Sequence, residues 1–123
     1  RLNETLKAAE NLSKKGVPIT VVDARFAKPL DENLIWQLAT THEAIMTIEE
    51  GSIGGFGSHV VNFLTKKGLM DSNLKFRSLT LPDIFIDQDT PDRMYKVANL
   101  DSVSIEEKVL DLLNSNIVLK KQN

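Results

Sequence analysis

Four glycines, two adjacent carboxylates and a histidine lie close together in the segment T-I-E-E-G-S-I-G-G-F-G-S-H-V, Thr47 to Val60. The segment follows a short apolar run and precedes a helix-like pattern, which is where an α/β sheet places its ligands. Three kinds of chemistry use such residues: phosphate binding by glycine-rich amides, acid–base catalysis by paired carboxylates, and a metal or nucleophile site at a histidine.

The glycines do not complete a phosphate-binding motif. A dinucleotide fingerprint needs G-x-G-x-x-G, and Gly55 and Gly57 are followed by Val60 at the third position. A P-loop needs Gly-Lys-Ser/Thr after its glycines, whereas Gly57 is followed by Ser58 and His59. The amides near Gly57 and Ser58 could still attract an anion through the helix dipole, so a small-anion site stays an alternative.

The carboxylates and histidines give little support for catalysis. Neighbouring strand residues point to opposite faces, so we expect one of Glu49 and Glu50 to act as a cap or to bridge to a loop amide or an arginine while the other is solvated. His42 and His59 are the two histidines, and with no cysteine and no i, i+4 partner neither indicates a zinc site. Ser58 and His59 are adjacent and do not face each other on a helix. Structural or surface roles are the better interpretation of both histidines.

A second group of candidate residues, Arg25 and Lys28, lies before the glycine-rich segment in the sequence. Pro29 fixes its own φ and biases Lys28 toward an extended conformation. This directs Arg25 and Lys28 off the end of the strand that we expect over Val17–Asp23. Two roles of these cations stay open. They could contact a substrate or another domain, or they could simply be solvated.

Helical and extended patterns alternate along the chain, which favours a mostly parallel sheet with helices on both faces. The glycines of the Thr47–Val60 segment should form a strand-to-helix crossing that needs positive φ and close backbone approach at a domain or subunit boundary. The expected elements are a helix from Leu2 closed by Gly16, a strand over Val17–Asp23 buried on both faces, a helix capped by Asp31 and ending near His42, a strand over Ala44–Ile48, a helix closed by Lys66, Lys67 and Gly68, a more exposed strand over Lys75–Leu81, a short helix from Pro91 toward Asn99, and a last helix with a capping box at Ser104 and Glu107.

Composition bounds the class of protein. The 123 residues, 41% hydrophobic and 26% charged, suit one globular domain over residues 1–123. The formal charge of −2 gives no field that would recruit nucleic acid or a membrane surface, and no apolar run approaches the roughly 20 residues of a membrane span. The absence of cysteine suits a reducing cytosol. An amphipathic pattern that starts at Arg1 suggests a cleaved or trimmed piece of a longer chain.

Four segments together carry a family resemblance. They are V-V-D-A-R-F-A-K-P-L-D, T-H-E-A-I-M-T-I-E-E-G, G-G-F-G-S-H-V and L-P-D-I-F-I-D-Q-D-T-P, in this order. Over nearly the whole chain, to about Leu113, the sequence closely resembles the C-terminal domains of the 1-deoxy-D-xylulose-5-phosphate synthase family, within the transketolase-like superfamily. The equivalent domains of transketolases and of 2-oxoacid dehydrogenase β subunits are the alternatives within that superfamily; a free-standing small-anion-binding module and a pure interaction domain are the alternatives outside it.

The resemblance implies a thiamine diphosphate- and Mg²⁺-dependent transferase, a cytoplasmic homodimer. Such an enzyme decarboxylates pyruvate and transfers the two-carbon fragment to glyceraldehyde 3-phosphate, and its product feeds isoprenoid, thiamine and pyridoxal biosynthesis. The third domain of the family is mainly architectural, so no catalytic, cofactor-binding or metal-ligating residue is carried over to this chain. Its partners would be the upstream domains and the second subunit.

The resemblance also implies a fold. The family's domain is a three-layer α/β/α sandwich with a five-stranded, largely parallel sheet and one antiparallel edge strand. Its first two strands would precede Arg1, so the chain would be truncated at its N-terminus. One of these strands would lie between the strands expected over Val17–Val22 and Ala44–Ile48.

Overall fold

The computed structural model describes residues 2–23, 30–49, 55–80 and 101–122, and side chains of the last helix as far as residue 114. Two compact units divide the chain: unit 1 comprises Arg1–Val22 with Ile86–Asn123, and unit 2 comprises Asp23–Phe85. The elements are α1 (Leu2–Lys14), α2 (Glu32–Thr41), β1 (Ala44–Ile48), α3 (Phe56–Lys66), the 3-10 turn η1 (Leu69–Asp71), β2 (Lys75–Leu79) and α5 (Ser102–Gln122).

The sheet of unit 2 is a parallel pair of strands. β1 and β2 pair in register from Ala44 opposite Lys75 to Ile48 opposite Leu79. The ladder continues past both ends of β1, where Lys75 N–H donates to the Glu43 carbonyl at 3.2 Å and Glu49 N–H donates to the Leu79 carbonyl at 2.9 Å. The strands expected over Ala44–Ile48 and Lys75–Leu81 are therefore confirmed, as is their parallel direction, although the second strand ends at Leu79.

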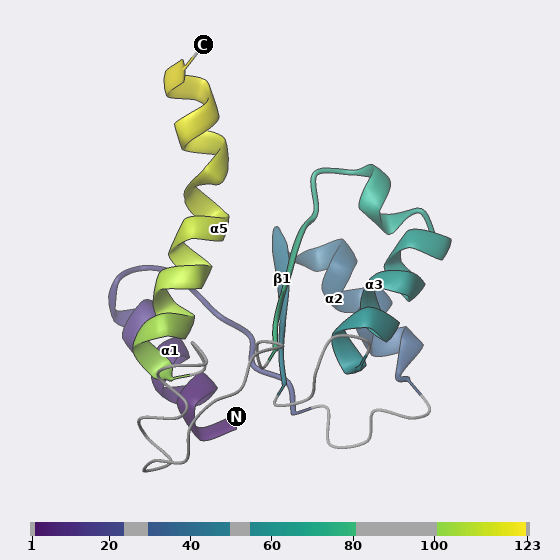
Figure 1. Cartoon of the computed structure of the whole chain (residues 1–123), viewed down its shortest axis with the longest axis horizontal. Coiled ribbons are helices and arrows are strands. Elements are labelled where there is room, and N and C mark those ends of the chain that lie inside the picture. The colour runs from purple at the N-terminus through teal and green to yellow at the C-terminus, as the bar shows by residue number, and fades with distance from the viewer. Residues whose placement is uncertain (1, 24–29, 50–54, 81–100, 123) are drawn as a thin grey trace, which may run out of the picture. The chain divides into compact units, whose positions relative to one another are not determined.

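Two helices cover this sheet in unit 2 (Figure 1). The apolar stripes of α2 and α3 meet in one buried cluster, and Ile45 of β1 and Phe76 of β2 pack against it. The buried members of the cluster are Ile35, Ala39, Val60, Phe63 and Leu64. Stripes at helical spacing and alternation along the strands place these side chains on one interface, which confirms the α/β class. The third layer of the expected sandwich stays a prediction.

Short-range signals set the helix ends as expected. The Asp31 carboxylate accepts a hydrogen bond from Leu34 N–H at 3.1 Å and caps α2. Beyond α1 and α3 the chain turns through glycines with positive φ, 84° at Gly16 and 71° at Gly68, where a side chain would strain the backbone. Both glycine stops were readable from sequence because they need no distant partner.

The strand expected over Val17–Asp23 is wrong. The structure describes these residues outside any strand. Ile19 and Val21 are half-buried while Thr20 and Val22 are exposed, Val22 to 42%, so the run is not covered on both faces. A β-branched run favours extended backbone, but a strand exists only where a neighbour supplies the ladder. The described sheet consists of β1 and β2, and the further strand inferred beside β1 stays a prediction.

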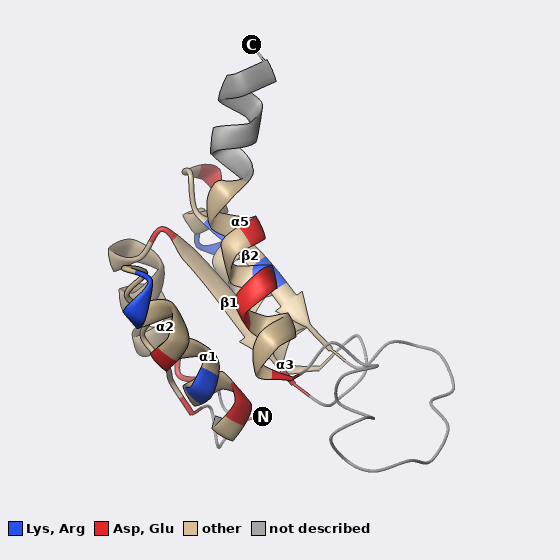
Figure 2. Cartoon of the chain, turned by 90° about the vertical axis from the view of Figure 1, so that its left-hand side faces the viewer, with Lys and Arg blue, Asp and Glu red and all other residues tan. Residues whose placement is uncertain are grey.

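Unit 1 is built on the pairing of α1 with α5. Ala8 and Leu12 of α1 and Ile105 and Leu112 of α5 are its buried apolar residues within the described chain. Residues of both signs of charge alternate along α1, seen as red and blue stretches of its ribbon in Figure 2. No helix of the described residues is long and apolar enough to cross a membrane.

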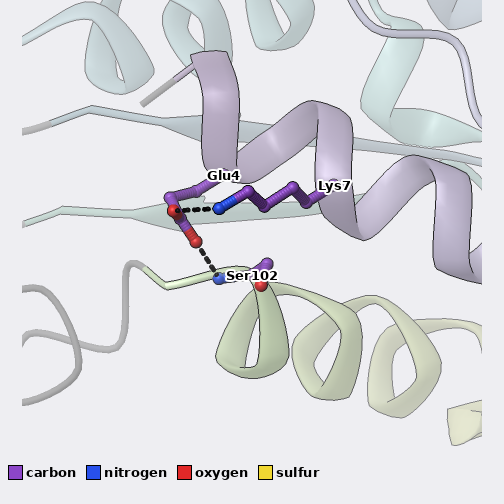
Figure 3. A network of polar contacts seen from close by, with 3 residues as sticks. All are labelled: Glu4, Lys7 and Ser102. Atoms are coloured by element: carbon purple, nitrogen blue, oxygen red, sulfur yellow. Dashed lines mark hydrogen bonds and ion pairs between the residues drawn. The ribbon is translucent and has the colours of Figure 1, made fainter. Parts of the chain in front are cut away.

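The capping box expected at Ser104 and Glu107 is wrong, because α5 begins earlier, at Ser102. Asp101 acts as the local cap: its carboxylate accepts a hydrogen bond from Ser104 N–H at 3.2 Å. Glu4, from the first turn of α1, accepts a hydrogen bond from Ser102 N–H at 2.7 Å (Figure 3). The second acceptor comes from 98 positions away in the sequence, which local reading could not supply.

Glu106 is the buried carboxylate of the α1–α5 interface, 8% exposed. It accepts hydrogen bonds from Asn11 Nδ2 at 3.1 Å and Lys15 Nζ at 3.2 Å. The hydrogen bond from Asn11, together with the Lys15 ammonium, holds the pKa of Glu106 below its ordinary value, although burial acts in the opposite direction.

Removing the interhelical cap should destabilise unit 1. Glu4→Ala is expected to lower the free energy of unfolding by about 1 to 2 kcal/mol, because a half-buried helix N-terminus loses a charged acceptor. Urea unfolding followed by far-UV circular dichroism measures it. Glu10→Ala is the matched control in the same helix: its ion pair with Lys14 is 71% exposed on both sides, so a change within about 0.5 kcal/mol is expected. Equal effects of the two variants would contradict the capping role.

Stability should depend on Glu106 in acid. A folded-state pKa below the unfolded value of about 4.5 means that the stabilisation is complete above that pH and is lost as pH falls through the lower, folded-state pKa. Urea unfolding at a series of pH values should therefore show a shallower acid loss in Glu106→Gln than in the parent protein. Glu107→Gln, at the exposed neighbouring position, is the control and should keep the parent's acid loss; an unchanged profile in Glu106→Gln would contradict the assignment.

Candidate functional site

The candidate site lies where β1 ends and α3 begins, at the glycine-rich segment. Glu49 follows the last residue of β1, and the described chain resumes at Gly55, the N-cap position of α3. Glu50, Gly51 and Gly54 lie outside the described residues. The site is therefore defined by the strand end, the first turn of α3 and the neighbouring end of β2.

Glu49 binds the start of α3. Its Oε2 accepts a hydrogen bond from Gly57 N–H at 3.3 Å. Gly55 has no side chain with which to cap the helix, so the carboxylate from the strand end takes that place. A negative charge at a helix N-terminus is favourable both as a hydrogen-bond acceptor and toward the helix dipole. The expectation that one of the two glutamates acts as a cap is confirmed for Glu49, and solvation of Glu50 stays a prediction because Glu50 lies outside the described residues.

A pair of hydroxyl groups lies beneath the same helical turn. Thr47 and Ser78 are register partners on β1 and β2, and Thr47 Oγ1 donates to Ser78 Oγ at 3.1 Å. Thr47 is only 6% exposed, and the hydrogen bond satisfies its hydroxyl in that buried position.

Gly57 allows α3 to approach this pair. A Cβ at position 57 would lie 2.8 Å from Thr47 Oγ1, 3.2 Å from Ser78 Cβ and closer still to Ser78 Oγ. Any larger residue would have to push the helix off the strands or displace both hydroxyls. Close approach, one of the two roles expected of the glycines, is confirmed here.

Gly55 is crowded by the glutamate itself. A Cβ there would lie 2.9 Å from Glu49 Oε1, a buried oxygen that has no hydrogen-bond partner among the described residues. Its φ is −86°, and the positive-φ glycines of the described chain are Gly16 and Gly68. The expectation of positive φ is therefore wrong for Gly55 and Gly57. Glycine is needed at these positions because a Cβ would clash with neighbouring side chains, and not because the backbone is left-handed.

His42 lies away from this site, whereas His59 lies in the first turn of α3 with its side chain exposed. His42 caps the C-terminus of α2, with Nδ1 3.1 Å from the Leu38 carbonyl and 2.9 Å from Thr41 Oγ1, at the opposite end of β1 from Glu49. Among the described residues no cluster of three or more His, Asp or Glu side chains could hold a metal ion. Arg25 and Lys28 lie outside the described residues.

Thr47 and Ser78 were missed by sequence reasoning. The available signal was a hydroxyl residue within each short strand, A-I-M-T-I and K-F-R-S-L. Only the register shows that the two hydroxyls are partners. Glu49 accepts a hydrogen bond from the first turn of α3, and Thr47 donates to Ser78 between the two strands. These contacts stabilise the packing of α3 on the sheet.

These observations define an α/β domain whose strand-to-helix crossing is a structural junction. Residues 1–105 match the family described as transketolase, C-terminal domain. The chain belongs to the transketolase C-terminal domain family.

Filling the space above the hydroxyl pair should destabilise the protein. Gly57→Ala is expected to cost about 1 to 3 kcal/mol through overpacking, although alanine is intrinsically about 1 kcal/mol better than glycine in a helix. Urea unfolding measures the cost, and Asn62→Ala, at an exposed position of the same helix, should be neutral or slightly stabilising. In a Ser78→Ala background the cost of Gly57→Ala should shrink, because the nearest atom is gone; strictly additive effects would contradict this packing.

Proposed function

We propose that the chain is the C-terminal domain of a thiamine diphosphate-dependent 1-deoxy-D-xylulose-5-phosphate synthase. The observation that carries the proposal is the combination, in one member of the transketolase C-terminal domain family, of V-D-A-R-F-A-K-P-L-D, I-E-E-G with G-G-F-G-S, and L-P-D-I-F-I. The parent enzyme would join pyruvate and glyceraldehyde 3-phosphate to give 1-deoxy-D-xylulose 5-phosphate and CO₂. The last of these motifs lies outside the described residues.

In this proposal the chain contributes architecture and contacts with other domains or the second subunit. The support is the chemistry of the crossing: Glu49 serves the first turn of α3, and Thr47 and Ser78 serve each other. Neither arrangement places an activated nucleophile or a free acid–base pair where a substrate would sit.

Thiamine diphosphate and Mg²⁺ do not fit the described residues. A diphosphate favours a helix N-terminus with free amides, and that of α3 already carries the Glu49 carboxylate, whose charge would repel it. The proposal therefore assigns the cofactor and metal to other domains of the parent enzyme.

The decisive test is the activity of the full-length enzyme that carries this chain. With thiamine diphosphate and Mg²⁺, it should release CO₂ from pyruvate and form 1-deoxy-D-xylulose 5-phosphate with glyceraldehyde 3-phosphate. Transfer from a ketose phosphate without CO₂ release would instead indicate a transketolase, and CO₂ release that needs a lipoyl acceptor would indicate a 2-oxoacid dehydrogenase. His59→Ala should keep kcat, because its exposed side chain has no assigned role in chemistry. A large fall in kcat with an intact oligomer would contradict the architectural role.

A small-anion-binding module is the competing function, and the helix N-terminus at Gly57 is the feature that favours it. Because Glu49 already binds this amide, titration of the chain with phosphate or nucleotides in a calorimeter should give no saturable heat. Two variants make the result specific: Ser58→Glu adds a charge at an exposed position of the first turn, and Asn62→Glu adds it farther along α3. A saturable heat that only Ser58→Glu abolishes would replace the architectural proposal with anion binding.

A further inference from the structure

We draw no further inference here: the strongest candidate, the buried and unpartnered Oε1 of Glu49 beside Gly55 at the start of α3, belongs to the strand-to-helix crossing already described, and no second feature of the described residues points to a ligand for it.

Discussion

The close approach of α3 to the paired strands is the constraint on which the described part of unit 2 depends. A helix can lie this near to two strands only if the residue of its first turn that faces them lacks a side chain, and Gly57 meets that requirement. The polar groups brought together there must also be satisfied once water is excluded. Thr47 donates to Ser78, and Glu49 Oε2 accepts from the helix amide, whereas Glu49 Oε1 is left buried with no hydrogen-bond partner among the described residues.

This junction changes the meaning of the glycine-rich segment. Glycines between a strand and a helix are shared by phosphate-binding loops and by tight structural crossings, because both need backbone to come close to something. Here the close neighbours of Gly55 and Gly57 are side chains of the protein itself. An acidic residue at the helix start opposes binding of a phosphate and favours a role in positioning.

Unit 1 reaches stability by a different route, through a helix pair whose members are distant in sequence. The apolar contacts of α1 and α5 exclude water, and this exclusion makes the polar contacts specific. Glu106 tolerates burial because Asn11 and Lys15 both donate to it, and the N-terminus of α5 receives an acceptor from Glu4. Residues of α1 and of the turn after it therefore supply the hydrogen-bond donors for Glu106 and the acceptor for the first turn of α5.

The sequence by itself determined the features whose partners lie within a turn or two. Asp31 as a cap, Gly16 and Gly68 as stops, the apolar stripes of α2 and α3 and the two strands all follow from local hydrogen bonding and periodicity. The tertiary structure alone decided which extended run became a strand, where α5 begins, and that Thr47 and Ser78 are partners. These outcomes depend on backbone and side-chain partners far away in the chain, and a one-dimensional pattern carries no information about which distant group will be there.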